Sequence, residues 1–220
     1  MNLIELRSVS KSYRDRPVVE QVSLVVEPGE RVVLFGPSGC GKSTVLLMIA
    51  GLVVPDSGDV LISGEVVASE GRNRCEPGQR GIGMVFQDLA LWPHMTVAEN
   101  IEFGLKAKRI PLEERKARIR KTAEIVGLDS HLDVRPGELS GGEQQRVAIA
   151  RALALEPRIV LMDEPLSSLD ETLNRKLRSE ILRLHKALGF ALIYVTHNRD
   201  EAQEIGTRIT YLSDGRIMSA

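Results

Sequence analysis

Apolar and β-branched residues gather in short runs over the first part of the chain, and turn-forming residues separate the runs. Runs of this length and composition are typical of strands, and the pair Pro28-Gly29 predicts a turn between two of them. A helix-like stretch follows the third run. The expected strands are 3–9, 18–26, 32–35, 60–62 and 82–86, and the expected helix extends from 42 to about 52.

The middle of the chain has a helical pattern. Thr96 and Glu99 have the spacing of a capping box, which predicts a helix that ends near residue 106. A second helix is expected between Pro111 and Gly127, because proline favours the first helical position and glycine the end. Its charges alternate in sign, which favours a solvated face over a binding patch. A third helix is expected over 141–155.

The last part of the chain alternates between strands and helices. Strands are expected at 159–162 and 191–196, a short helix at 200–205, and a hairpin turn at Asp214-Gly215. Asp170 caps a longer helix between the two strands. The apolar face of that helix consists of Leu173, Leu177, Ile181, Leu184 and Leu188, with Gly189 at its end. Strands alternating with helices at both ends of the chain predict an α/β fold with a mostly parallel core, into which the helical middle is inserted.

Composition narrows the class of protein. A chain of 220 residues is long enough for one or two domains that need no disulfide or metal. A net charge of -1 gives no reason to expect nucleic acid as a partner. Cys40 and Cys75 are too few for a disulfide framework. No apolar run approaches the ~20 residues of a membrane span, and no export signal is visible, so we expect a soluble cytosolic protein.

One segment matches the phosphate-binding pattern G-x-x-x-x-G-K-[ST] between an expected strand and an expected helix. Its residues are Gly36, Pro37, Ser38, Gly39, Cys40, Gly41, Lys42, Ser43 and Thr44. The glycines let backbone N–H groups turn toward phosphate oxygens, Lys42 would reach the β- and γ-phosphates, and Ser43 would hold Mg²⁺. A simple glycine-rich turn is the alternative, but the strand–helix context favours nucleotide binding. For Cys40 we favour a backbone role over that of a reactive thiol.

Two carboxylates follow the apolar strand 159–162. Asp163 is placed where phosphate-loop enzymes hold Mg²⁺. Glu164 could accept a proton from an attacking water. Taken alone, the pair could be solvated acids at a strand end, but the phosphate loop favours the functional interpretation.

A segment between the phosphate loop and these carboxylates points to a family. It reads Leu139-Ser140-Gly141-Gly142-Glu143-Gln144-Gln145-Arg146, and it could simply begin a helix, because Ser140 and Glu143 also form a capping-box pattern. It resembles the signature of ABC-type ATPases, the nucleotide-binding subunits of ATP-binding cassette transporters, and the resemblance extends from Tyr13 to about Gly215. The resemblance implies one domain, residues 1–220. Its phosphate-loop core would comprise 1–88 and 156–220 with an N-terminal antiparallel β part, and its helical subdomain about 89–155.

The resemblance also assigns roles to individual residues. It implies that Tyr13 stacks on adenine, although a tyrosine there could also serve packing. Gln87 would touch Mg²⁺ and the attacking water, and His197 would contact the γ-phosphate. The segment 167–170, which ends at Asp170, would cross a dimer interface. Two positions depart from the common pattern: Ser168 stands where many relatives have Ala, and Asn198 where Asp is commoner, which leaves the role of the Asn198 side chain open.

In this family the signature of one subunit binds the ATP held by the other. Ser140, Gly141, Gly142 and Glu143 would therefore face the nucleotide of a second copy, and two ATP molecules would be sandwiched in a dimer. The resemblance implies that the isolated chain is nearly inactive. The cofactors it implies are ATP and Mg²⁺.

The segment 91–100 resembles importer ATPases of the sugar, polyamine and inorganic-ion groups, where it touches a coupling helix of the membrane subunit. Trp92 could be a contact residue there or could serve packing. The resemblance implies transmembrane permease subunits and an extracytoplasmic solute-binding protein as partners, with the chain peripheral at the cytoplasmic face of the membrane. Because the chain ends at Ala220, we expect no C-terminal regulatory domain. The alternatives are an exporter or lipid- or lipoprotein-extracting ABC ATPase and a soluble, non-transport ABC ATPase.

Overall fold

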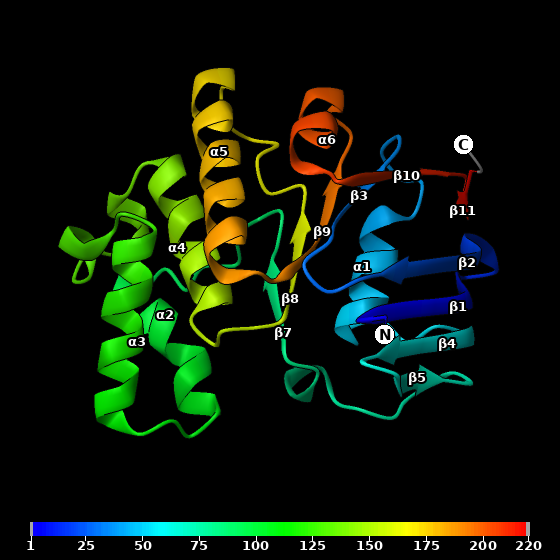
Figure 1. Ribbon diagram of the computed structural model, residues 1–220, viewed down its shortest axis with the longest axis horizontal. Coiled ribbons are helices and arrows are strands. Elements are labelled where there is room, and N and C mark those ends of the chain that lie inside the picture. The colour runs from blue at the N-terminus through cyan, green and yellow to red at the C-terminus, as the bar shows by residue number, and fades with distance from the viewer. Residues whose placement is uncertain (1, 219–220) are drawn as a thin grey trace.

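The computed structural model describes residues 2–218, and within them the strands form two sheets (Figure 1). The first is antiparallel, in the order β2-β1-β4-β5-β6, and the second has the order β11-β10-β3-β9-β8-β7. The strands of the first are β1 (Ile4–Tyr13), β2 (Arg16–Val26), β4 (Ser57–Ile62), β5 (Glu65–Ser69) and β6 (Arg72–Asn73). Those of the second are β3 (Arg31–Phe35), β7 (Ile82–Val85), β8 (Ile159–Asp163), β9 (Ala191–Thr196), β10 (Arg208–Ser213) and β11 (Arg216–Ile217).

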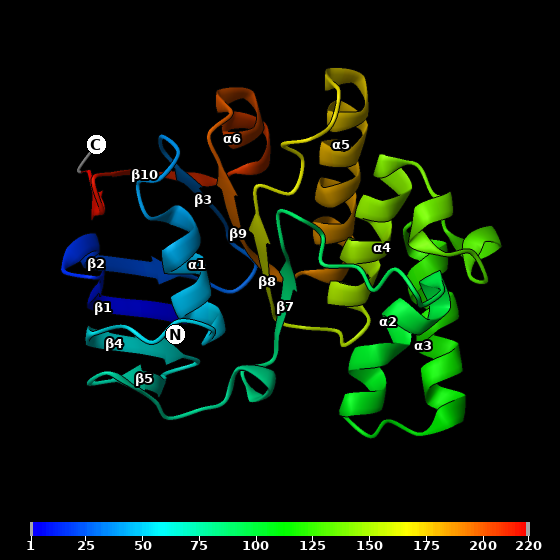
Figure 2. The same ribbon diagram turned by 180° about the vertical axis from the view of Figure 1, so that it is seen from behind.

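The helices are α1 (Lys42–Ala50), α2 (Val97–Ala107), α3 (Leu112–Ile125), α4 (Gly141–Leu153), α5 (Glu171–Leu188) and α6 (Arg199–Ile205). Helix α1 lies between the two sheets, and α5 and α6 lie on the other side of the second sheet (Figures 1 and 2). No helix within residues 2–218 combines the length and the apolarity needed to cross a membrane.

Strand direction places several chain segments at one edge of the second sheet. Strands β10, β3, β9, β8 and β7 run parallel, and only β11 returns antiparallel. Phe35 is level with Thr196, and Asp163 is level with Val195. The residues that follow these strands therefore leave the sheet at the same edge, where open α/β sheets bind their ligands.

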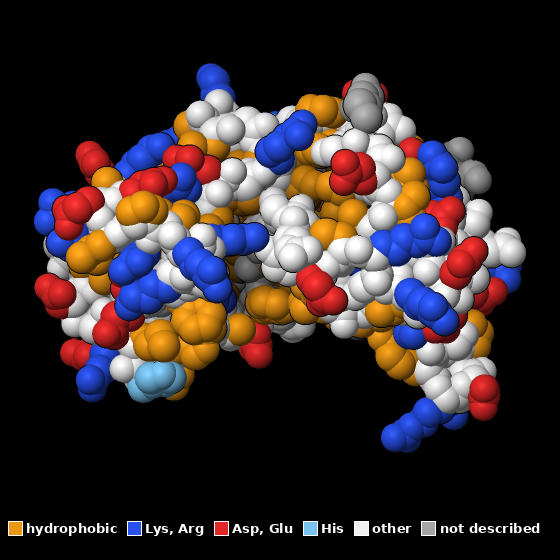
Figure 3. Space-filling view, turned by 90° about the horizontal axis from the view of Figure 1, so that it is seen from below, with side chains coloured by type: hydrophobic (Ala, Val, Ile, Leu, Met, Phe, Trp, Pro, Cys, Tyr) orange, Lys and Arg blue, Asp and Glu red, His pale blue; other side chains and the backbone are white. Residues whose placement is uncertain are grey.

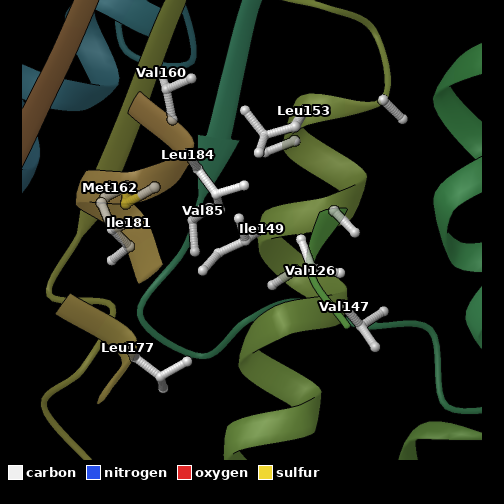
Figure 4. Packing of buried hydrophobic residues seen from close by; sticks show 14 of the residues in the cluster. Val85, Val126, Val147, Ile149, Leu153, Val160, Met162, Leu177, Ile181 and Leu184 are labelled. Carbon is white, nitrogen blue, oxygen red and sulfur yellow. The ribbon is translucent and has the colours of Figure 1, made fainter. Parts of the chain in front are cut away.

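Alternating side chains of the parallel strands divide the core into two layers. Ile159 and Leu161 of β8 belong to a cluster with α1 and the antiparallel sheet. Val160 and Met162 of the same strand belong to the other cluster, with residues of α4 and α5 (Figure 4). The near-continuous apolar sequence of this strand is explained because both of its faces are buried.

The helices of the middle part pack on one another. Ile101 of α2, Ile119 of α3 and Val147 of α4 share one buried cluster. Both capping boxes expected from the sequence are formed, by Thr96 with Glu99 and by Ser140 with Glu143. The boundaries of a helical subdomain at 89 and 155 stay a prediction.

The predicted fold class is confirmed: an α/β protein with one antiparallel and one mostly parallel sheet. Strands β5 and β6 were not expected, because both are short: β5 buries only its last three residues, Val67, Ala68 and Ser69, and β6 is the polar pair Arg72-Asn73. Helix α1 ends at Ala50 rather than near 52, because Gly51 adopts a left-handed conformation that caps the helix.

Candidate functional site

The loop between β3 and α1 is shaped by two glycines. Gly41 has φ of 104°, and a Cβ atom on it would lie 2.5 Å from the carbonyl oxygen of Val18. A Cβ atom on Gly36 would lie 2.1 Å from the carbonyl oxygen of Leu212. Side chains at these positions would displace the loop from its neighbours, so the conformation requires glycine.

Helix α1 begins without a side-chain cap. Its N-cap residue is Gly41, whereas α2, α4, α5 and α6 each begin with a side chain that accepts a bond from the helix backbone. The first N–H groups of a helix need partners and carry partial positive charge. The start of α1 therefore offers its N–H groups to an anion.

A cavity of about 360 Å³ opens beside this loop. It is lined by Val18, Ser38, Gly39, Gly41, Lys42, Ser43, Thr44, Gln87 and Glu164. Lys42 is only 3% exposed, and its Nζ donates to the carbonyl oxygens of Gly36 at 2.9 Å and Pro37 at 2.8 Å. The ammonium group is thus held within the loop itself, close to where a phosphate group would lie.

Ser43 and Asp163 form a pair of oxygen ligands. Ser43 Oγ donates to Asp163 Oδ1 at 2.8 Å. Burial raises the pKa of Asp163, and the neighbouring charge of Glu164 adds to this, while the bond from Ser43 and the charge of Lys42 lower it. Within residues 2–218 no group of three or more His, Cys, Asp or Glu side chains could hold a metal. The pair suits Mg²⁺, which takes few protein ligands and completes its shell with phosphate oxygens and water.

Glu164 connects the loop to the next strand end. Its φ of 42° lies in the left-handed region, and its N–H donates to Val195 O at 3.1 Å. One carboxylate oxygen lies 3.8 Å from Lys42 Nζ, and the other lies 2.9 Å from His197 Nδ1. Strained backbone of this kind persists only where its surroundings hold it, and it is frequent at functional sites.

The end of β9 supplies the histidine. His197 follows the strand and is exposed. The next residue, Asn198, caps α6 by accepting from the N–H groups of Asp200 and Glu201. This cap accounts for the asparagine whose role the sequence left open.

Other residues expected at the site lie apart from the cavity. Tyr13 is half-exposed at the end of β1, with Lys11 Nζ 5.7 Å from its ring centroid. Ser140 begins α4, and Asp170 caps α5 by accepting from the N–H groups of Thr172 and Leu173. The signature residues Ser140, Gly141, Gly142 and Glu143 do not line the cavity within residues 2–218. A single chain therefore contains two separate groups of the expected residues.

Two features of the site were not found from the sequence. Val18 lines the cavity because β2 passes beside the phosphate loop. Glu201, 3% exposed, accepts bonds from Tyr194 and Thr196 behind the site. The signal for Glu201 was weak: it is an acid in a short helix that shares its buried face with two apolar residues, Ala202 and Ile205.

The site is that of a phosphate-loop nucleotide-binding protein. It has a glycine loop between a strand and a helix, a helix start without a side-chain cap, a buried lysine and a Ser–Asp pair. Residues 19–167 match the ABC transporter family. The chain belongs to that family.

Curated relatives carry the names of import proteins. The chain is 48% identical over 217 residues to the sn-glycerol-3-phosphate import ATP-binding protein UgpC 2 of Agrobacterium fabrum, covering 99% of this chain and 57% of that protein. It is 48% identical to the maltose/maltodextrin import ATP-binding protein MalK of Salmonella typhimurium, covering 99% and 58%. It is 45% identical to the spermidine/putrescine import ATP-binding protein PotA of Oleidesulfovibrio alaskensis, covering 98% and 56%. The chain thus spans less than three fifths of these relatives.

A solved structure resembles the whole fold. The dimeric, post-hydrolysis state of the ATP-binding cassette MJ0796, bound to ADP and Pi, is 36% identical. It superposes with a TM-score of 0.86 and covers 98% of this chain and 97% of that one.

Proposed function

We propose that this chain binds and hydrolyses ATP as the energy-supplying subunit of an ABC importer. The observation that carries the proposal is the position of Glu164, whose carboxylate lies between Lys42 and His197 at the mouth of an uncapped phosphate loop. A proton acceptor, a phosphate-binding cation and a second polar group thus meet at one place.

The proposed nucleotide site uses the loop, the Ser–Asp pair and one aromatic ring. The backbone of 36–44 and the Lys42 amine would hold the phosphates, and Tyr13 would stack on the adenine. Ser43, Asp163 and Gln87 would hold Mg²⁺. ATP supplies the phosphoanhydride bond that is broken, and Mg²⁺ supplies positive charge opposite the phosphates.

Glu164 is the proposed general base. Its carboxylate can accept a proton from an attacking water, and the contact with His197 Nδ1 restrains its orientation. Lys42 is already removed from water, and its two backbone carbonyl partners leave a third N–H for a phosphate.

A second copy of the chain completes the proposed site. Ser140, Gly141 and Gly142 at the start of α4 do not line the cavity in the described part of the chain, and a helix start attracts anions. The solved relative is a dimer. We infer a dimer in which this helix start, with Glu143 and with Asp170 nearby in the following helix, faces the nucleotide of the partner copy.

We further propose the domain division expected from the sequence, with a core of 1–88 and 156–220 and a helical subdomain of about 89–155. The subdomain carries a half-exposed aromatic pair: the rings of Trp92 and Phe103 lie 4.2 Å apart, and Arg151 lies 4.9 Å from the Trp92 ring. Figure 3 shows hydrophobic side chains among charges of both signs on the face of the helical part. Trp92 therefore packs within its subdomain and can also contact the membrane subunit.

Import is favoured over export because the curated relatives described above are all named import ATP-binding proteins. The solutes in their names differ, which fits transporters in which partner proteins select the solute. We propose transmembrane permease subunits and a solute-binding protein as partners, with the chain at the cytoplasmic face of the membrane.

Phosphate release by the purified chain tests the ATPase function. We expect Mg²⁺-dependent turnover that rises more than linearly with protein concentration, because two copies form each site. Lys42→Ala should abolish ATP binding. Turnover that is equal in the two proteins would exclude the phosphate-loop site, and a gene neighbourhood without permease genes would count against import.

A further inference from the structure

A buried carboxylate lies behind the phosphate cavity without lining it. Glu201 of α6 is 3% exposed. Its carboxylate accepts bonds from the Tyr194 hydroxyl at 2.9 Å, the Thr196 hydroxyl at 2.8 Å and the Asn174 amide at 2.8 Å. Burial of an acid is unfavourable unless its hydrogen bonds are made, so three such bonds mark a built arrangement.

Two of the three donors belong to the strand that precedes His197, and the third is hydrogen-bonded to the segment that carries Glu164. Tyr194 and Thr196 belong to the end of β9, and His197 follows directly. Asn174 belongs to α5, and its amide also donates to Leu166 O at 3.3 Å, two residues beyond Glu164. One carboxylate therefore connects the turn of His197 to the segment of Glu164.

Further hydrogen-bonding features restrain the turn around His197 and the side chain of Asn174. Thr196 Oγ1 accepts from the N–H of Asn198, so the turn around His197 is bonded before and after the histidine. Among residues 2–218 the Asn174 Oδ1 atom has no hydrogen-bond partner, so the two bonds donated by its amide orient this side chain. Burial and the charge of Glu201 raise the pKa of Tyr194, which keeps its hydroxyl a donor.

We propose that Glu201 is a positioning residue for hydrolysis: its carboxylate sets the separation at which the side chains of Glu164 and His197 meet. The left-handed backbone of Glu164 needs such external support, because it is not stable by itself. The inference rests on the proposed ATPase function and adds to it a residue that does not touch the nucleotide cavity.

Kinetics of Glu201→Ala and Glu201→Gln provide the first test. We expect Glu201→Ala to lower kcat about tenfold or more, with the affinity for a fluorescent ATP analogue changed less than about threefold. Glu201→Gln should recover much of kcat, because it keeps the volume and one acceptor. Glu204→Gln is the matched control: it lies on the same helix, is exposed, and pairs with Arg178. Equal losses of kcat and nucleotide affinity in Glu201→Ala would overturn the proposal.

A double variant separates positioning from general stability. In a His197→Ala background, Glu201→Ala should lower kcat by less than about twofold more, because the positioned histidine is already absent. If Glu201→Ala lowers kcat by the same factor with and without His197, the inference is contradicted. If Glu201→Ala does not fold, Tyr194→Phe removes one donor at similar volume and should give the same split between kcat and affinity.

A spectroscopic readout keeps the test independent of activity. The chain has four histidines, so the His197 imidazole signal can be assigned in NMR spectra by comparison with His197→Ala. This signal should shift in Glu201→Ala and stay unchanged in Glu204→Gln; an unchanged signal in Glu201→Ala refutes the positioning role. If the wild type and Lys42→Ala instead hydrolyse ATP at the same rate, the ATPase proposal itself is refuted.

Discussion

At Glu164, conformation and chemistry constrain the same residue. The backbone adopts φ of 42°, the N–H completes a bond to β9, and the carboxylate reaches both Lys42 and His197. A left-handed residue other than glycine costs about 1–2 kcal/mol. The surrounding bonds offset that cost, which explains how an acid is held at the mouth of the phosphate loop.

The two left-handed glycines of the loop make a matched pair for mutation. A Cβ atom on Gly41 would meet the Val18 carbonyl at 2.5 Å, whereas on Gly39 it would meet nothing within 4 Å. We expect Gly39→Ala to lower the free energy of unfolding by about 1–2 kcal/mol, and Gly41→Ala by more, because the backbone of β2 must also move. Urea unfolding without nucleotide measures both, and equal losses would contradict the steric argument.

At the scale of elements, helix starts divide into two kinds. Helices α2 and α4 begin with capping boxes, and α5 and α6 begin with Asp170 and Asn198 as caps. Helices α1 and α3 begin at Gly41 and Pro111 without a side-chain cap, and of these two starts the one of α1 lines the cavity. Side chains that satisfy helix N–H groups stabilise a helix, and their absence leaves those groups for a ligand.

The C-terminal end of α5 is tied to the turn before β3 by a neutral histidine. Because the Gly29 carbonyl can only accept, Nε2 of His185 carries the proton at 3.0 Å, and Nδ1 accepts from Arg31 at 3.4 Å. Burial lowers the pKa of His185, and the charge of Arg31 lowers it further. The contact with Arg31 therefore requires the neutral form, whereas the bond to Gly29 alone would raise the pKa.

This histidine predicts a pH dependence of stability. Its folded pKa lies below the ordinary value of 6.5, so its contribution is fully present above pH 6.5 and is lost as the pH falls from there toward the folded pKa. We expect the difference in urea midpoint between pH 8 and pH 5 to be smaller in His185→Gln than in the wild type. Parallel pH curves for the two proteins would contradict the assignment.

At the scale of the whole molecule, the proposed site consists of two groups of residues. The parallel strands bring the first group together, and the second lies at other helix starts. The loop after β3, Glu164 after β8 and His197 after β9 meet at one sheet edge. Ser140 and Asp170 lie at helix starts elsewhere. A second copy is the simplest arrangement that joins the two halves.

Dimer formation is expected to depend on ATP and on the helix start of α4. Glu164→Gln should bind ATP without hydrolysing it and should elute as a dimer from a sizing column with ATP and Mg²⁺. Adding Ser140→Arg should keep ATP binding but return the protein to a monomer, because the arginine side chain obstructs the helix start. A Glu164→Gln monomer at saturating ATP would refute the sandwich arrangement, and a dimer that persists with Ser140→Arg would exclude α4 from it.

The features that the sequence alone determined are those made by contiguous residues. The phosphate loop, the capping boxes, the strand 191–196 and the alternation of strands and helices depend on local spacing, backbone conformation and short-range hydrogen bonds. The weak edge strands β5 and β6 were missed, because sheet pairing rather than local propensity defines them.

Only the tertiary structure decided which distant residues meet. The contact of Glu164 with His197 and the three bonds to Glu201 join residues of separate strands and helices. Sequence patterns report the periodicity of one segment, whereas such distances depend on how sheet register and helix packing place several segments together. For that reason the sequence could propose Glu164 and His197 singly, and could not find Glu201, whose proposed role arises only from what it contacts.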